Sequence, residues 1–197
     1  MTFDFLIALT LFCAATLFTP GPNNLMLMAS GANFGLHRSL PHLAGVALGF
    51  PLMILPVGLG VMKVFDLWPP AYTILMAASV LYLLYLAWKI ANAAPPKHAH
   101  AEARPLTFLQ AAAFQWVNPK AWSMALGAIT LYAASRDLTS ILWVSGTFAV
   151  LGTVSALVWV TLGTGVRRIL AEPKRLRLFN WTMAALLIAS MIPVLIG

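Results

Sequence analysis

The stretch TPGPNN, residues 19–24, interrupts the first hydrophobic run of the chain. Residues 3–18 before it and residues 25–29 after it are mostly apolar. A proline inside a helix costs about 3 kcal/mol, because its ring clashes with the preceding turn and removes one backbone hydrogen bond. Prolines, a glycine and adjacent asparagines in so short a stretch therefore predict that the first hydrophobic helix is broken at this point.

The composition places this break in a membrane. Of 197 residues, 61% are hydrophobic and 9% are charged, whereas a soluble domain has about 45–50% apolar and about 25% charged residues. Several stretches approach the roughly 20 apolar residues that cross a bilayer. The net charge of +7 comes from basic residues between these stretches and not from one face, so we expect a lipid bilayer as partner and no nucleic acid. The sequence predicts an all-α integral membrane protein.

Six hydrophobic segments divide the chain into two halves. They lie at about 3–30, 40–62, 71–90, 107–133, 139–163 and 179–196. A polar, proline-rich linker at about 92–106 separates repeat one (about 1–91) from repeat two (about 107–197) within a single membrane domain. Because each half has an odd number of segments, the halves must cross the membrane in opposite senses. We therefore predict six transmembrane helices arranged as two inverted three-helix repeats.

Lysine and arginine are distributed unequally between the two sides of this topology. One side holds Arg38, Lys89, Lys97, Arg104, Arg167, Arg168, Lys174, Arg175 and Arg177, and the other holds Lys63 and Arg136. Cytoplasmic loops carry the excess of basic residues, so both termini are predicted to lie outside the cytoplasm. The N-terminus lacks the basic region of a cleaved signal peptide, so we expect the first segment to be retained.

A second break is predicted near the middle of the fourth segment. Asn118-Pro119-Lys120 occupies the place in the second half that TPGPNN occupies in the first. Matching broken helices in inverted halves indicate a transport site at the midplane of the membrane. Helices 1 and 4 are therefore predicted to be broken at proline and to form one substrate site.

The chemistry of such breaks suits a small zwitterion. The prolines remove helical donors from the carbonyls of Thr16, Phe18 and Gln115. New helix N-termini after each break attract a carboxylate, while the freed carbonyls and the asparagine side chains could accept hydrogen bonds from an ammonium group. The candidate substrate-binding residues are Pro20, Gly21, Pro22, Asn23, Asn24, Asn118, Pro119 and Lys120. The alternative is that the prolines only kink the helices.

Lys120 is a special case among these candidates. If its helix starts near Thr107, it lies roughly 20 Å along that helix, too deep for its side chain to reach the surface. We then expect it to bind a carboxylate or to serve in coupling. If the helix starts near Ala111, the side chain can extend to the interface instead.

Other chemistries find little support in the sequence. The single cysteine, Cys13, excludes an internal disulfide, and no serine–histidine–carboxylate set or metal-ligand cluster occurs at depth. His98 and His100 are too few for a metal site. We expect no enzyme, no cofactor and no metal. His37 and His42 are interpreted as surface or interfacial residues, with proton transfer as the alternative.

The motifs together resemble a known family, the lysine exporter superfamily in its LysE/RhtB branch. The matching residues are TPGPNN, the glycine spacing Gly35, Gly45 and Gly49 within GANFGLHRSLPHLAGVALGF, YLLYLAWKIA (82–91) and FQWVNPKAW (114–122). The resemblance covers essentially the whole chain. It implies a multi-pass exporter of amino acids in the bacterial inner membrane, driven by the proton gradient, with periplasmic termini. The small-xxx-small pairs Gly31/Gly35 and Gly45/Gly49 predict close helix packing within the chain, with a homo-oligomer contact as the alternative.

One departure from the family pattern bears on the substrate. Many relatives have an aspartate directly after Pro-Gly-Pro, where this chain has Asn23. The resemblance therefore implies a secondary transporter for small, neutral amino acids, of the homoserine/threonine, leucine or cysteine/O-acetylserine type, working by proton antiport. The double asparagine is most similar to the cysteine and O-acetylserine exporters. An uncoupled channel or facilitator for small zwitterionic metabolites is the alternative.

Overall fold

The computed structural model describes residues 3–61, 63–93, 104–133, 135 and 137–192, without the side chains of Val64 and Asp66. Over these ranges every regular element is an α-helix or a 3₁₀ turn. The elements are α1 (Phe3–Phe18), α2 (Pro22–Phe34), α3 (Leu36–Gly58), α4 (Lys63–Leu67), α5 (Pro70–Ala91), α6 (Phe108–Phe114), the 3₁₀ turn η1 (Gln115–Val117), α7 (Pro119–Tyr132), α8 (Leu138–Val166), the 3₁₀ turn η2 (Ile169–Ala171) and α9 (Pro173–Ala189). Most of the predicted linker, with His98 and His100, lies outside the described residues.

Both predicted breaks are present, so this part of the prediction is confirmed. α1 ends at Phe18 and α2 begins at Pro22, and the two helices are bent by 56°. In the second half, α6 ends at Phe114, and η1 leads to α7 at Pro119. Each new helix has its proline at the first position, where the missing N–H costs no helical hydrogen bond.

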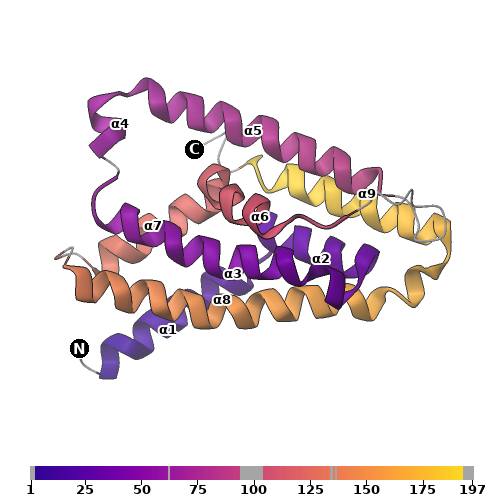
Figure 1. Ribbon diagram of the computed structural model, residues 1–197, viewed down its shortest axis with the longest axis horizontal. Coiled ribbons are helices and arrows are strands. Elements are labelled where there is room, and N and C mark those ends of the chain that lie inside the picture. Colours follow the sequence, from indigo (N-terminus) through magenta and orange to yellow (C-terminus); the bar gives the residue numbers. More distant parts are fainter. Residues whose placement is uncertain (1–2, 62, 94–103, 134, 136, 193–197) are drawn as a thin grey trace.

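Within the described residues, three helices are long and apolar enough to cross a membrane by themselves. They are α3, α5 and α8, and the bent pair of α1 and α2 passes the same test as a fourth candidate. Figure 1 shows the long helices side by side, with the ends of α2, α5 and α8 at one end of the bundle and α4 and the end of α7 at the other. The chain is therefore an all-helical membrane bundle.

The second and the sixth predicted segments differ in their bounds from the structure, since the sixth, predicted at 179–196, is α9 with the bounds Pro173–Ala189. The second begins at Leu36 and not near residue 40, and Pro41, Pro51 and Pro56 lie inside a continuous α3. A helix packed in a bundle tolerates such isolated prolines because neighbouring groups satisfy the freed backbone atoms. The fourth segment begins where it was predicted, with Thr107 as the N-cap of α6, and it is broken as predicted. α6 begins against the middle of α3, where the Phe108 carbonyl lies at Gly45, and the depth of Lys120 in the membrane stays a prediction.

Glycines set the closest helix contacts, as predicted for packing within the chain. A Cβ on Gly31 would collide with the Val160 carbonyl of α8, and one on Gly163 would collide with the Met28 carbonyl of α2. A Cβ on Gly49 would lie 2.6 Å from the Ala112 Cα of α6. Small residues let backbones approach in a bilayer, where helix association depends on packing. α2 and α8 are thereby held against each other at close backbone distance.

α2 is also held by a buried amide pair near its end. Asn33 Nδ2 donates to Asn180 Oδ1 of α9 at 2.8 Å, and Asn180 Nδ2 donates back to Asn33 Oδ1 at 3.1 Å. Asn180 Nδ2 also donates to the Ala93 carbonyl at 3.2 Å. A paired amide avoids the cost of about 1–3 kcal/mol for each unsatisfied buried polar group.

Candidate substrate site

The two helix breaks meet in the structure. Asn23, in the first turn of α2, donates through Nδ2 to Gln115 Oε1 of η1 at 2.8 Å, and Gln115 Nε2 donates to Asn23 Oδ1 at 3.1 Å. Gln115 is fully buried. Residues from the two halves of the sequence are therefore joined at the point where both helices are interrupted.

Lys120 reaches across from the second break to the first. Its Nζ donates to Thr19 Oγ1 at 2.7 Å and to the Thr19 carbonyl at 2.9 Å, with the Pro20 carbonyl at 3.5 Å. Gly21 makes this position available, because a Cβ there would lie 2.7 Å from Lys120 Cδ. The ammonium group is therefore held at the break itself, and α7 starts one residue before it.

The backbone carbonyls around the first break are largely satisfied by the chain itself. Asn24 Nδ2 donates to the carbonyls of Leu17 at 2.7 Å and Thr19 at 2.8 Å, and Ser155 Oγ of α8 donates to Leu17 at 2.9 Å. The Thr16 carbonyl accepts from Thr19 Oγ1 at 2.8 Å. Among these atoms, the Thr16 carbonyl is one that we predicted as an acceptor for an ammonium group, and it is already used.

The same correction applies to the second break. The Gln115 carbonyl accepts from the Asn118 N–H at 3.3 Å, because η1 tightens the chain into a 3₁₀ turn. Asn118 Oδ1 accepts from the Lys120 N–H at 3.2 Å and so caps α7. By contrast, no side chain of the described residues caps α2, which begins after Gly21. The first-turn N–H groups of α2 therefore remain available to an anion.

One pocket lies between the two breaks, and we call it the break pocket. Its lining residues are Thr16, Leu17, Gly21, Asn23, Asn24, Val46, Ala47, Phe50, Pro51, Asn118, Lys120, Ala121, Met124, Phe148, Gly152, Ser155 and Ala156. Its empty volume, including the part open to the outside, is about 500 Å³. No carboxylate contributes to this lining from the described residues.

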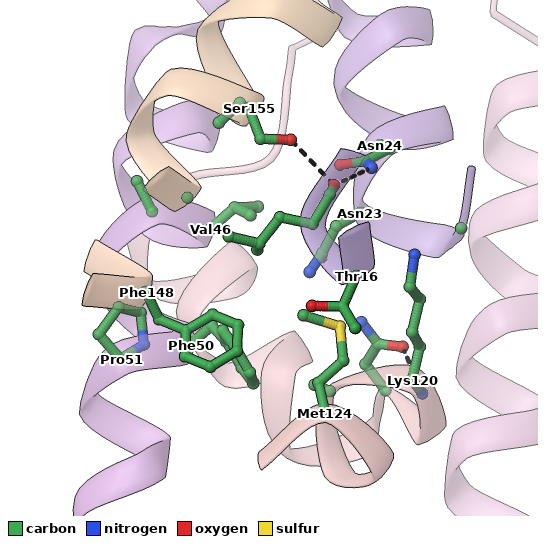
Figure 2. A pocket seen from close by; sticks show the side chains of 17 residues that line it. Thr16, Asn23, Asn24, Val46, Phe50, Pro51, Lys120, Met124, Phe148 and Ser155 are labelled. Atoms are coloured by element: carbon green, nitrogen blue, oxygen red, sulfur yellow. Dashed lines mark hydrogen bonds between the residues drawn. The ribbon is translucent and has the colours of Figure 1, made fainter. Parts of the chain in front are cut away.

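The break pocket has a polar side and an apolar side. Figure 2 shows Asn23, Asn24 and Lys120 on one side and the rings of Phe50 and Phe148 on the other. These two rings pack edge to face with centroids 5.1 Å apart. Such a wall excludes water and strengthens the electrostatic attraction between groups on the polar side.

The structure brings five of the eight candidate residues into this lining: Gly21, Asn23, Asn24, Asn118 and Lys120. Pro20 is exposed, while Pro22 and Pro119 start their helices outside the lining. The sequence interpretation missed Gln115, although a glutamine near the middle of an apolar segment was a signal. It also missed Phe148 and Ser155, which lie in a long, unbroken hydrophobic run without any distinguishing pattern.

The interpretation of His42 as a surface or interfacial residue is wrong. His42 is 2% exposed and lies inside α3. His37, one turn earlier, is exposed as expected. Because α3 already starts at Leu36, His42 lies in its second turn and on its buried side.

A helical membrane bundle whose two broken helices join at one pocket has the architecture of a membrane transporter. The chain belongs to the LysE type translocator family, whose model matches residues 14–195. The resemblance found from the motifs is thereby confirmed, and the protein is a translocator and not an enzyme.

Its curated relatives are of similar length. The chain is 33% identical to the "Cysteine/O-acetylserine efflux protein" of Escherichia coli O157:H7 over 192 residues, which cover 95% of this chain and 96% of that protein. The protein of the same name from E. coli strain K12 is 32% identical over the same shares. The one from Shigella flexneri is 32% identical, covering 88% of each chain. No solved structure matches the chain.

Proposed function

We propose that this protein exports small, neutral amino acids of the cysteine and O-acetylserine kind across the bacterial inner membrane, and that the substrate binds in the break pocket. The observation that carries the proposal is the ammonium group of Lys120 at a pocket where two helix N-termini meet. The relatives named as cysteine/O-acetylserine efflux proteins support the substrate class.

The polar groups of the break pocket suit the two charges of an amino acid. The substrate carboxylate binds between Lys120 Nζ and the uncapped N-terminus of α2. Within the described part of the chain, Asn24 Oδ1 accepts no hydrogen bond, so it is available to the substrate ammonium. A short side chain then meets Phe50 and Phe148. This apolar wall favours a neutral side chain over a charged one.

The arrangement of the bundle supports the inverted-repeat topology. We assign six spans: the pair α1 and α2, then α3, α5, the broken helix of α6, η1 and α7, then α8 and α9. The described basic residues Lys89, Arg104 and Arg167 lie at the end of the bundle where α2, α5 and α8 end (Figure 1). The positive-inside rule makes this end cytoplasmic and both termini periplasmic. Rocking of the two repeats about the break pocket then exposes it to each side in turn.

Transport is proposed to proceed by proton antiport. One observation favours an uncoupled facilitator as the second candidate: Asn23 forms a neutral amide pair with Gln115, and no described carboxylate lines the break pocket. An antiporter with this pocket needs its proton carrier elsewhere in the chain.

Efflux measurements distinguish these functions. Cells or vesicles loaded with a panel of amino acids, including cysteine and O-acetylserine, are compared with and without the protein. Faster efflux of the neutral amino acids supports export, whereas equal efflux for the whole panel refutes it. Accumulation against a concentration gradient that an uncoupler abolishes supports antiport, and downhill transport that is insensitive to the uncoupler supports the facilitator.

A further inference from the structure

A second pocket lies beside α2, toward the end of the bundle where the basic residues gather. We call it the basic pocket. It lies between α2, α3, α5 and the non-helical residues 104–107, and among its lining residues are Ser30, Asn33, His42, Lys89, Arg104 and Leu106. It shares no lining residue with the break pocket.

His42 is the unusual residue of the basic pocket. Both ring nitrogens are buried, and neither has a hydrogen-bond partner in the described part of the chain. Every protonation state of histidine has at least one N–H donor, and a buried polar group without a partner requires an explanation. A ligand or water in the pocket that His42 lines supplies the missing partner.

The charge of the basic pocket indicates an anion. Lys89, in the last turn of α5, and Arg104 are exposed side chains that line the pocket. No carboxylate of the described residues lines it with them. Two cations at the rim with no acidic neighbour in the lining attract and hold a carboxylate, and arginine can bind it through two hydrogen bonds.

The backbone around the basic pocket also indicates water. Residues 104–107 are non-helical and lead to α6, which begins against Gly45 in the middle of α3. Non-helical backbone at membrane depth is tolerated where it is buried in protein or lines a water-filled cavity. Arg104 is exposed and Leu106 is 8% exposed, so this segment runs from solvent into the bundle along the pocket.

The two pockets lie one helical turn apart along α3. His42 lines the basic pocket and Val46 lines the break pocket, which corresponds to about 6 Å along the helix axis. On α2, Asn24 lines the break pocket and Met26 the basic pocket. Leu25 and Leu43, which are 4% and 7% exposed, belong to the apolar cluster at this level. A thin apolar layer therefore separates the two pockets.

We propose that the basic pocket is a second binding site, on the cytoplasmic side, where the carboxylate of the amino acid docks at Lys89 and Arg104 before the substrate passes His42 to the break pocket. This inference rests on the proposed function and on its membrane orientation. It assigns Lys89 and Arg104 to substrate capture and His42 to the inner end of the same site.

The test uses inverted vesicles, whose outer face is the cytoplasmic face of the membrane. Uptake of O-acetylserine and of cysteine is measured against concentration for the wild type and for the double variant Lys89→Met/Arg104→Met. We expect the KM of the double variant to rise about tenfold or more, as for the loss of one good polar contact, with the maximal rate unchanged. Lys174→Met is the matched control, because Lys174 is an exposed lysine on the same side that does not line the basic pocket.

His42→Leu provides a second measurement that does not depend on the cations. If His42 faces the substrate, the variant raises the KM while the thermal stability of the purified protein stays equal or increases, because an unpartnered buried ring has been replaced by an apolar side chain. An unchanged KM with increased stability means that His42 only packs, and this result overturns its assignment.

The remaining outcomes separate the two proposals. If wild-type vesicles transport no amino acid, the proposed function fails. If they transport and the double variant keeps the wild-type KM, the second site fails alone. The comparison is repeated in neutral and in anionic lipids. A KM difference present in both supports substrate capture, whereas one confined to anionic lipid identifies a lipid headgroup as the occupant and overturns the proposal.

Discussion

The replacement Lys120→Met tests the break pocket most directly. The Lys120 ammonium makes hydrogen bonds of 2.7 and 2.9 Å to Thr19, and methionine keeps most of the side-chain volume without the charge. Hydrogen bonds to a charged group contribute about 1.5–3 kcal/mol, and we take the lower value because Thr19 is exposed. A loss of that size in substrate binding corresponds to about a tenfold rise in the dissociation constant of the substrate.

We therefore expect Lys120→Met to lower the transport efficiency, Vmax/KM, by about tenfold or more, since the substrate also loses its cationic partner. Uptake into inverted vesicles, normalised to the amount of protein in the membrane, measures this. Lys63→Met is the control, because Lys63 is an exposed lysine of α4 far along the chain from both breaks. Equal efficiency for the two variants would refute the role of Lys120 in binding.

A further variant distinguishes the two ways in which Lys120 can act. Thr19→Val removes the 2.7 Å hydroxyl contact but leaves the ammonium in place. If Lys120 only holds the first break closed, Thr19→Val should reproduce much of the loss seen with Lys120→Met. If Lys120 binds the substrate carboxylate, Thr19→Val should retain most of the transport, and Lys120→Arg should recover part of it because the charge is kept.

Three other predictions concern stability. Gly163→Ala places a Cβ against the α2 backbone and should destabilise the folded protein by about 1–3 kcal/mol. Gly165→Ala, with open space at its Cβ position, should be neutral or stabilising. Thermal unfolding in detergent compares the two variants, and equal midpoints would contradict the close packing of α2 and α8. Gln115→Leu leaves the Asn23 amide without its partner and should cost about 1–3 kcal/mol in the same assay, while Gln115→Glu tests whether charge is tolerated there. Hydrogen bonds from Ser135 and Ser140 hold the pKa of the exposed Asp137 carboxyl below its usual range. The contribution of this carboxylate to folding stability is therefore complete above its unfolded pKa of about 3.9 and is lost as the pH falls through its folded pKa. Unfolding midpoints measured against pH test this, and the same acid dependence in the wild type and in Asp137→Asn would disprove it.

The breaks could be predicted from the sequence because each combines residues whose effects agree. In TPGPNN, two prolines and a glycine oppose a helix, and Asn24 donates to the carbonyls that the break exposes. At Asn118-Pro119, the asparagine caps the new helix and proline occupies its first position. Proline alone is a weaker signal, because Pro51 and Pro56 leave α3 continuous. The neighbouring residues decide whether a proline ends a helix.

The rest of the site depends on tertiary packing. Phe148 and Ser155 reach the break pocket only because the glycine contacts bring α8 against α2, and no local pattern reports such a contact. The burial of His42 depends on where α3 starts and on the path of residues 104–107 beside it. The Thr16 and Gln115 carbonyls were predicted to be available, but each has a donor three residues away, in the Thr19 hydroxyl and the Asn118 N–H. The contact of Ser155 with the Leu17 carbonyl joins residues 138 positions apart, and no local pattern predicts it.

The two amide pairs on α2 have a mechanical consequence. Asn23 and Gln115 form one pair of reciprocal hydrogen bonds near the start of the helix, and Asn33 and Asn180 form the other near its end. Each amide pair joins the first half of the sequence to the second through two hydrogen bonds between neutral groups. α2 is thus joined to the second half near both of its ends. A movement of the two halves against each other, which the proposed function requires, must preserve both amide pairs or break at least one of them.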